Sequence, residues 1–504
     1  MTSPQGTTPP RPPTVLVVGS GFAGFHCMRR LEKHLPPDAA ELLLASSADY
    51  LLYSPLLPNV AAGVVEPRHI AVGLHAALRR AKVLLGHVVA VDIAGRTATL
   101  LRPDGSAQEL AWDRLVLAPG GVSRTLNIPG VAEHGLGLKT LAEATYLRDH
   151  VLRELENADA ADDPGRRRAC CTFVVVGAGY SGTETAAQMQ LVTSRAAADY
   201  PRLRAEELRW VLVDLAPRVL PELGRRLGDD AMEVLRRRGV EVRLGTTVEE
   251  ATADGVRLSD GETISTHTLV WCTGVTPSPL IETLGLPTER GRLKVTADLR
   301  VPGADGVFAF GDAAAVPDLT RPGQLTGQTA QHAQRQGKTA ARNVAASLGF
   351  GRAVDYRHRD LGFAVDLGGF DAVASPFGVA LGGLPGLVAT RGYHLLALPS
   401  TGNRIRVSLD WLLDWAMKPQ LAQLGFLRED QATMAAAEHT GIYPAPPADE
   451  WEAAARDVPT TRAVVTDQGL PRPRSRQLDG PSSQRANDSQ QLPGDGVRRL
   501  DTRP

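Results

Sequence analysis

Two glycine-rich turns carry the clearest chemistry in this chain. Each follows a run of β-branched and apolar residues and precedes a helix-compatible stretch: Thr14–Gly24 is TVLVVGSGFAG and Thr172–Gly182 is TFVVVGAGYSG. In such a turn the first glycine permits a sharp bend, the second lets the backbone approach a pyrophosphate, and the third allows close helix–strand packing. The following helix points free N–H groups and its positive end at the phosphates. The duplication therefore predicts two dinucleotide-binding units.

The second unit has a carboxylate at the position where such units recognise the ribose of NADH. The predicted strand Arg209–Asp214 (RWVLVD) ends in Asp214, which would accept hydrogen bonds from both ribose hydroxyls and repel a 2′-phosphate. This favours NADH over NADPH, although Arg218 is close enough in sequence to weaken the discrimination. The alternative is an Asp214 that caps a helix or is merely solvated. In the first unit the strand ends in Ser46, which can hydrogen-bond a ribose only without charge assistance.

Three further segments end apolar runs with residues that suit a cofactor. The FGD segment at 310–312 places Asp312 at a strand end, where it can accept a hydrogen bond from a ribityl hydroxyl. The APG segment at 118–120 and the CTG segment at 272–274 end strands where the backbone must cross between domains. Together with the two glycine turns, these segments are far more specific than either turn alone.

Alternating strands and helices would position these residues. Apolar runs without alternation are typical of strands buried on both faces of a parallel sheet. We therefore expect an α/β fold with two Rossmann-like dinucleotide-binding domains and a C-terminal membrane-associated region. Residues 14–134 and 292–350 would form the first, discontinuous domain, residues 135–291 the second, and residues 351–435 the C-terminal region.

Length and composition limit the number of domains and the kinds of partner that this chain can have. Of 504 residues, 43% are hydrophobic and 22% are charged, and the formal net charge is −1. This length predicts about three domains, and the balanced charge offers no basic field, so nucleic acid is excluded as a partner. No apolar run reaches the roughly 18 residues of a membrane-spanning helix.

Four segments complete the expected organisation. Residues 1–13 are expected to form a flexible, Pro-rich leader without the apolar stretch of a secretory signal, and residues 440–504 a disordered tail. Leu51–Gly63 is expected to be a Pro-rich loop, and a helix is expected from Leu325 to about Leu348.

With these motifs the chain resembles the flavoproteins that have two dinucleotide-binding domains, and within them the type II NADH:quinone dehydrogenases, single-subunit enzymes that pump no protons. The resemblance runs from about Thr14 to Phe426. Its supporting segments are PLLPNVAAG (55–63), LKTLAEATYLR (138–148), LVDLAPRVLPEL (212–223), LVWCTGVTPSPL (269–280), FAFGDAA (308–314) and AQHAQRQG (330–337). It implies FAD at the first turn, NADH at the second, and electron transfer from NADH through FAD to a quinone.

The motifs and the resemblance together assign the cofactor contacts. The residues expected to bind FAD are Gly19, Gly21, Phe22, Ala23, Gly24, Ser46, Ser54, Pro119, Gly120, Gly311, Asp312 and Gln331. The residues expected to bind NADH are Gly177, Gly179, Tyr180, Ser181, Gly182, Glu184, Asp214, Thr273 and Gly274.

The resemblance also implies three catalytic candidates, Glu184, Gln331 and Arg335. Glu184 matches the family's glutamate near the nicotinamide–flavin interface, which implies proton handling or positioning; alternatively it complements the helix dipole. The family signature Ala-Gln-x-Ala-x-Gln-x-Gly is matched at Gln331, but its second Gln falls on Arg335. Ser46 and Pro119 depart from the family's usual acid and threonine.

Cysteine usage separates the chain from its relatives. Four cysteines and no Cys-x-x-Cys favour a reducing compartment. Only Cys27 lies on the first predicted helix, where disulfide reductases of this architecture need two, and none follows Cys272, where sulfide:quinone reductases need one. Cys170, Cys171 and Cys272 are expected to be buried and structural. The 12 histidines show no spacing typical of metal ligands, so no metal site is predicted.

A tryptophan-rich segment at 404–418 predicts contact with a membrane, where the quinone acceptor would be reached. Arg404–Lys418 (RIRVSLDWLLDWAMK) suits a helix in a bilayer interface, with Tyr393–Leu398 as its partner. The features that suit it are a shared face (Leu409, Leu412, Leu413, Ala416), two tryptophans one turn apart (Trp411, Trp415) and flanking cations (Arg404, Arg406, Lys418). Asp410 and Asp414 fit poorly with deep insertion, so peripheral attachment is expected. The alternative is a helix packed on the protein or in a homodimer interface.

The predicted function is therefore an FAD-dependent NADH:quinone oxidoreductase attached to the cytoplasmic face of the cell membrane, with a quinone and a lipid surface as partners. A soluble NAD(P)H-dependent reductase of a protein or small acceptor remains an alternative, motivated by Ser46 and Arg335. A non-enzymatic flavin redox sensor is a second alternative, against which Glu184 and Asp214 argue.

Overall fold

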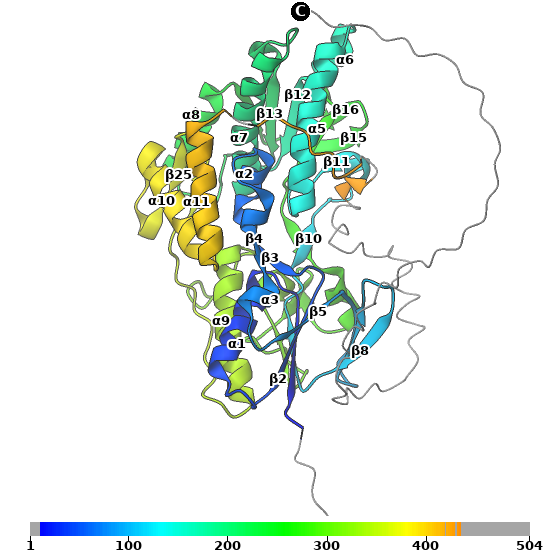
Figure 1. The fold of residues 1–504 in the computed structure, drawn as a ribbon, viewed down its shortest axis with the longest axis vertical. Coiled ribbons are helices and arrows are strands. Elements are labelled where there is room, and N and C mark those ends of the chain that lie inside the picture. Colours follow the sequence, from blue (N-terminus) through cyan, green and yellow to red (C-terminus); the bar gives the residue numbers. More distant parts are fainter. Residues whose placement is uncertain (1–10, 419, 429–430, 435–504) are drawn as a thin grey trace, which may run out of the picture. The chain divides into compact units, whose positions relative to one another are not determined.

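The computed structural model describes residues 11–418, 420–428 and 431–434. Its framework contains two five-stranded parallel sheets (Figure 1). The first has the strand order β22-β9-β1-β2-β5. Its strands are β1 (Thr14–Val18), β2 (Glu41–Ser46), β5 (Lys82–Leu85), β9 (Arg114–Leu117) and β22 (Val307–Ala309). Because β22 comes from far along the chain, this unit is discontinuous.

The second sheet repeats the plan with the order β11-β18-β12-β13-β14. Its strands are β11 (Gly135–Leu136), β12 (Thr172–Val176), β13 (Arg209–Asp214), β14 (Val240–Leu244) and β18 (Thr268–Trp271). All five residues of β1 and of β12 are buried, as the unalternating apolar runs predict. In each sheet the strand order reverses beside the strand that precedes a glycine turn, and such a switch point is where α/β sheets bind ligands.

Smaller sheets surround this framework. The strands β10 (Gly121–Ser123) and β19 (Val275–Pro277) pair directly after the segments 118–120 and 272–274, where the chain was expected to cross between units. The remaining strands are β3 (Tyr50–Leu52), β4 (Ala71–Gly73), β6 (His87–Asp92), β7 (Thr97–Leu101), β8 (Ala107–Ala111), β15 (Val248–Thr252), β16 (Gly255–Leu258), β17 (Thr263–Ser265), β20 (Thr288–Glu289), β21 (Arg292–Lys294), β23 (Ala314–Ala315), β24 (Ala364–Asp366), β25 (Ala372–Ala374) and β26 (Leu381–Gly382).

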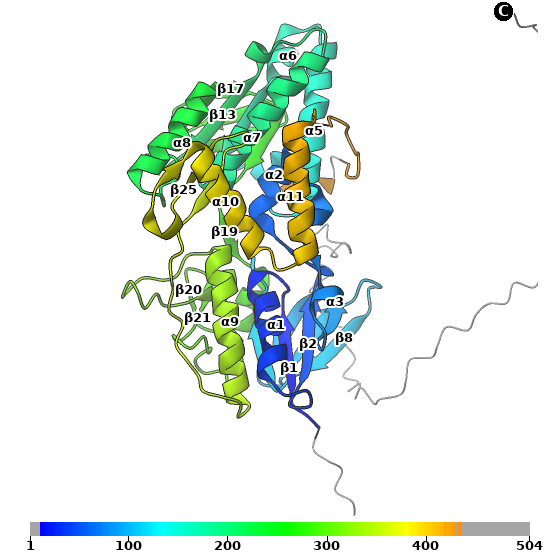
Figure 2. The same cartoon turned by 60° about the vertical axis from the view of Figure 1, so that its left-hand side comes forward.

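The helices bring distant segments together. They are α1 (Phe22–His34), α2 (Leu57–Ala61), α3 (Leu74–Ala77), α4 (Val131–His134), α5 (Leu141–Ala160), α6 (Pro164–Cys170), α7 (Tyr180–Ala196), α8 (Arg225–Arg237), α9 (Ala330–Ser347), α10 (Gly383–Ala397) and α11 (Thr401–Ala416). Short 3-10 helices cover 54–56, 67–70, 197–199, 205–207, 279–284, 311–313 and 376–378. Helices α1 and α9 lie side by side (Figures 1 and 2), so close that a Cβ on Gly337 would lie 2.3 Å from the Ala23 carbonyl oxygen.

Two expectations about local structure are wrong. The segment 51–63 is not a loop, because β3, a 3-10 helix and α2 occupy most of it. Pro55 and Pro58 each lie in the first turn of one of these helices, where the missing N–H would have no partner in any case. The late helix starts at Ala330 rather than Leu325, and the Thr329 side chain caps it.

The predicted interfacial helix exists as α11, but only one of its tryptophans faces outward. Trp411 is buried, and its Nε1 donates a hydrogen bond to Asn59 Oδ1 on α2 at 3.1 Å. Trp415 is 68% exposed. Asp410 also faces the protein, 2.6 Å from His69 Nδ1. Asp410, one of the two aspartates expected to oppose deep insertion, therefore lies on the inner face of the helix.

None of the described helices is long and apolar enough to cross a membrane. The tail at 440–504 and residues 1–10 of the predicted leader lie outside the described residues.

Candidate active site

The first glycine turn forms a cradle with room for a pyrophosphate. Gly19 adopts a φ of +96°, and a Cβ there would lie 2.2 Å from the Ala118 carbonyl oxygen. A Cβ on Gly24 would lie 1.9 Å from the Gly19 carbonyl oxygen, so backbone packing requires both glycines. Gly21, the N-cap of α1, has no atom within 4 Å of an added Cβ. This open space beside the helix N-terminus fits the predicted FAD.

The second turn repeats this geometry. Gly177 has a φ of +110°, and its Cβ would lie 2.4 Å from the Cys272 carbonyl oxygen. A Cβ on Gly182 would lie 1.8 Å from the Gly177 carbonyl oxygen, whereas an added Cβ on Gly179, the N-cap of α7, meets open space. The turn therefore fits a second dinucleotide in the same way.

Asp214 lies beside the second turn, at the end of β13. Its two carboxylate oxygens accept hydrogen bonds from the N–H groups of Ala178 (2.5 Å) and Ala216 (2.6 Å). Each oxygen keeps a further lone pair that can accept from a ribose hydroxyl. Arg218 donates to the Pro221 carbonyl oxygen at 2.9 Å. This contact holds the guanidinium on its own loop.

Two cavities meet between the sheets. The first cavity, of about 550 Å³, lies at the first turn and contains the predicted residues Gly21, Phe22, Ala23, Ser54, Pro119, Gly120, Asp312, Glu184 and Gln331. The second cavity, of about 1160 Å³, lies at the second turn and contains Gly177, Gly179, Asp214 and Thr273. Residues that line both are Tyr180, Ser181, Cys272, Gly274, Val275, Gln328, Thr329, Gln331 and Phe363. This shared wall is where two bound dinucleotides could bring their reactive rings together.

Glu184 lines the first cavity and is almost fully buried. Its Oε1 accepts a hydrogen bond from the Asp366 N–H at 2.8 Å. Burial raises the pKa of Glu184 well above its usual range, and the nearby Asp366 carboxylate adds to the increase. Burial therefore favours the neutral carboxylic acid form of Glu184, which can donate a hydrogen bond as well as accept one.

Gln331 and Arg335 have different positions although they lie one helical turn apart on α9. Gln331 lines both cavities, and its Nε2 donates to the Gly362 carbonyl oxygen at 2.8 Å. Arg335 lines neither cavity, and its guanidinium contacts Gln331 Oε1 at 3.2 Å and His358 Nδ1 at 3.3 Å. The structure thus places Arg335 behind the site, where it holds Gln331.

Five other predicted cofactor residues also line neither cavity. They are Gly19, Gly24, Gly182, Ser46 and Gly311. The first three serve backbone packing. Ser46 donates to the Ala48 carbonyl oxygen at 2.7 Å and contacts Ser20 Oγ at 2.6 Å, and the Gly311 N–H donates to Gln336 at 2.8 Å.

The region after residue 350 supplies side chains that the sequence analysis missed. Tyr393 and His394 on α10 line the first cavity, and Phe363 stacks on Tyr180 with ring centroids 5.6 Å apart. His394 Nδ1 lies 3.0 Å from Tyr53 Oη, and burial lowers the pKa of His394 to about 4. Both residues lie in the segment 393–398 that was expected only to accompany the interfacial helix. No motif marked them as cavity residues, because their neighbours at the cavity come from elsewhere in the chain.

The cysteine expectations hold in part. Cys170 and Cys171 are buried, as predicted, and Cys27, for which no burial was predicted, is buried as well. Cys272 is only half-buried and belongs to the wall that the two cavities share.

Comparison with known proteins agrees with this geometry. The sequence pattern of the pyridine nucleotide-disulphide oxidoreductases matches residues 13–337. The chain is 31% identical over 421 residues to the type II NADH:quinone oxidoreductase Ndh of Mycobacterium tuberculosis, covering 80% of this chain and 88% of that protein. It is 32% identical over 418 residues to the demethylphylloquinone reductase NdbB of Synechocystis sp., covering 80% and 97%. The solved structure of NDH2 from Plasmodium falciparum in complex with NADH shares the fold, with a TM-score of 0.75, 16% identity and coverage of 82% and 100%.

The fold and the paired cradles define a pyridine nucleotide-disulphide oxidoreductase. Within that class, the chain belongs to the family of type II NADH:quinone oxidoreductases. The predicted family and the predicted α/β fold are thereby confirmed, whereas the membrane association of the C-terminal region stays a prediction.

Proposed function

We propose that this protein transfers a hydride from NADH to FAD and passes two electrons on to a membrane quinone, without pumping protons. The observation that carries the proposal is the wall shared by the two cavities, since each cavity begins at a dinucleotide cradle. The names of the two relatives above support a quinone as the acceptor. FAD, when bound, supplies the two-electron chemistry.

The protein's own residues would bind the two dinucleotides and orient their rings, and one residue would hold a proton near those rings. The N-termini of α1 and α7 would hold the two pyrophosphates, and Asp214 would fix the NADH ribose. Tyr180 and Phe363 form a flat stacked pair in the shared wall, against which a planar ring can be oriented. Glu184 would hold a proton on its carboxyl group beside that wall, while Arg335 would keep Gln331 oriented.

The quinone would enter from the side of α10. Tyr393 and His394 line the first cavity from that helix, and Leu396 at its end is 78% exposed. An apolar ring could therefore pass from an exposed apolar surface to the first cavity.

Anaerobic spectroscopy tests the electron path. NADH should bleach the flavin absorption of the purified protein, and a menaquinone or ubiquinone analogue should restore it. NADPH and a soluble ferredoxin-like acceptor are the matched controls. Restoration by the soluble acceptor but by no quinone would reject the assigned acceptor while leaving the NADH half-reaction standing.

We further propose that α10 and α11 attach the protein to an anionic bilayer. The exposed apolar side chains of these helices are Leu384, Val388, Leu396, Ile405, Leu409, Leu412, Leu413 and Trp415. Where the two helices meet, Leu396 borders a cavity of about 240 Å³ whose lining includes Arg29, Arg30, Lys33, Lys338 and Arg404. Among the described ion pairs none involves these five cations, so an apolar face lies beside uncompensated positive charge. This combination suits a membrane interface with anionic headgroups.

Vesicle flotation tests this attachment. The protein should float with phosphatidylglycerol vesicles at low salt and less with phosphatidylcholine vesicles. Leu409→Asp should abolish flotation, whereas Leu126→Asp, an exposed leucine elsewhere, should not. Equal flotation of the two variants would refute the docking face. If Leu409→Asp instead converts a sedimenting dimer to a monomer, the face binds a second copy.

We assign the attached side to the cytoplasmic leaflet, where NADH is available.

A further inference from the structure

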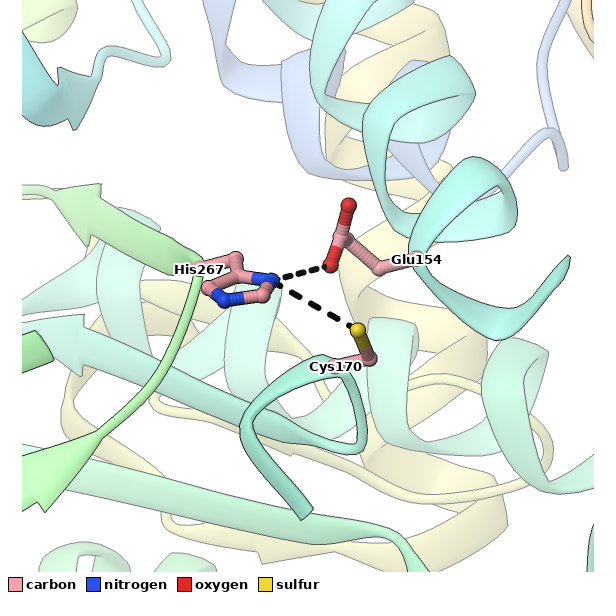
Figure 3. A group of neighbouring side chains, drawn as sticks. All are labelled: Glu154, Cys170 and His267. Carbon is pink, nitrogen blue, oxygen red and sulfur yellow. Dashed lines mark hydrogen bonds and ion pairs between the residues drawn. The ribbon is translucent and has the colours of Figure 1, made fainter. Parts of the chain in front are cut away.

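Three potential metal ligands meet on the second unit, away from the two cavities. Glu154 comes from α5, Cys170 is the last residue of α6, and His267 precedes β18 (Figure 3). Their ligand atoms all lie within 4.8 Å of one another. Residues 16 and 97 positions apart cannot be recognised as a ligand set by spacing, which is why the sequence predicted no metal site.

The three side chains converge on one point. His267 Nδ1 lies 2.9 Å from Glu154 Oε2 and 3.5 Å from Cys170 Sγ, and Figure 3 shows both contacts reaching the same nitrogen. One proton on that nitrogen can be directed at only one of the two partners. A tetrahedral zinc ion, with bonds of about 2.0 Å to nitrogen and about 2.3 Å to sulfur, would hold these two atoms about 3.5 Å apart.

The electrostatics of the cluster also favour a cation. Glu154 is 6% exposed, and its second oxygen, Oε1, accepts from Asn157 at 2.9 Å. Its ion-pair partner among the described residues is His267, and no lysine or arginine is paired with it. Its charged form is stabilised by the neighbouring His150 and by hydrogen bonds from His267, Asn157 and Cys170. The positive partners of this buried carboxylate are therefore histidines, and a bound metal ion would add a permanent positive charge.

We propose that Glu154, Cys170 and His267 bind a divalent zinc-class ion, with water as the fourth ligand. Thiolate, imidazole and carboxylate are the donors that zinc prefers. The His267 side chain is 27% exposed, which leaves a path for the ion. Cys170 loses its thiol proton to solvent when the metal–sulfur bond forms, so no redox partner is needed.

The position of the site indicates a structural role. Cys170 lies just before β12 and His267 just before β18, the two strands whose far ends carry the second cradle. An ion here would tie the amino ends of both strands to α5. It would stabilise the second unit without touching FAD, NADH or quinone, so the inference does not depend on the proposed function.

Metal titration of the holoenzyme tests the site. Protein cleared of metal with a chelator should bind one Zn²⁺ per chain in equilibrium dialysis followed by elemental analysis. Cys170→Ser and Glu154→Gln should each weaken this affinity by about tenfold or more. Cys171→Ser is the matched control, because its buried thiol neighbours the site without belonging to it, and its affinity should be unchanged.

Cobalt substitution provides a second readout. Co²⁺ at this site should give ligand-field bands to the red of the flavin absorption, and Cys170→Ser should remove them. The flavin spectrum shows whether each variant is folded, and His267→Gln replaces any variant that is not. Absence of Zn²⁺ binding by the folded wild-type protein, or equal binding by the Cys170 and Cys171 variants, would overturn the proposal.

Discussion

Adding one methyl group at Gly179 should weaken NADH binding without unfolding the protein. Gly179 caps α7 with a φ of −75°, a conformation that alanine adopts readily, and its Cβ would enter open space in the second cavity. That space is where the pyrophosphate is expected. Crowding of this kind costs about 1–3 kcal/mol, which corresponds to an increase of about 5- to 150-fold in the KM for NADH.

The assay separates binding from folding. Gly179→Ala should keep its flavin and its kcat at saturating NADH. Gly182→Ala is the contrasting variant, since its Cβ would lie 1.8 Å from the Gly177 carbonyl oxygen and should cause loss of the folded holoenzyme. Gly21→Ala, the equivalent change at the first turn, should reduce FAD retention instead. A Gly179→Ala protein with full flavin content and an unchanged KM would refute the cradle assignment.

Three further outcomes follow from the positions of individual side chains. Because burial raises the pKa of Glu184, the folded state keeps a proton that the unfolded state releases above about pH 4.3. Wild-type stability should therefore fall by about 1.4 kcal/mol per pH unit from there up to the folded-state pKa, relative to Glu184→Gln, in urea unfolding across pH. Trp411→Ala should cost about 3–5 kcal/mol in the same assay, whereas the exposed Trp415→Ala should change stability by less than about 0.5 kcal/mol and weaken vesicle binding. Asp214→Asn should lower the kcat/KM preference for NADH over NADPH by about tenfold, since a charge-assisted hydrogen bond contributes at least about 1.5 kcal/mol; an unchanged preference would contradict the ribose contact.

The local parts of the site were predictable because they depend on neighbours in sequence. A buried strand, a glycine turn and a helix N-terminus are contiguous, so the residue pattern alone places Gly21 and Gly179 at open cradles. Asp214 is the last residue of its strand, and it lines the second cavity. The domain boundaries and the cytoplasmic location remain predictions.

Side-chain direction was harder to predict. Arg335 and Gln331 lie one turn apart on the same helix, yet only Gln331 faces the cavities. Trp411 and Trp415 also lie one turn apart, but the helix turns one inward and the other outward. A spacing of four residues advances the side chain about 40° around a helix, so the partner surface decides which residue is buried.

The sequence by itself determined that this chain holds two dinucleotides, because the required backbone geometry is encoded in short contiguous segments. Only the tertiary structure decided what surrounds them. The contact of Glu184 with Asp366, the placement of Tyr393 at the first cavity and the meeting of Cys170 with His267 each join residues from distant parts of the chain. Such contacts depend on how helices and sheets pack, and no local pattern specifies that packing.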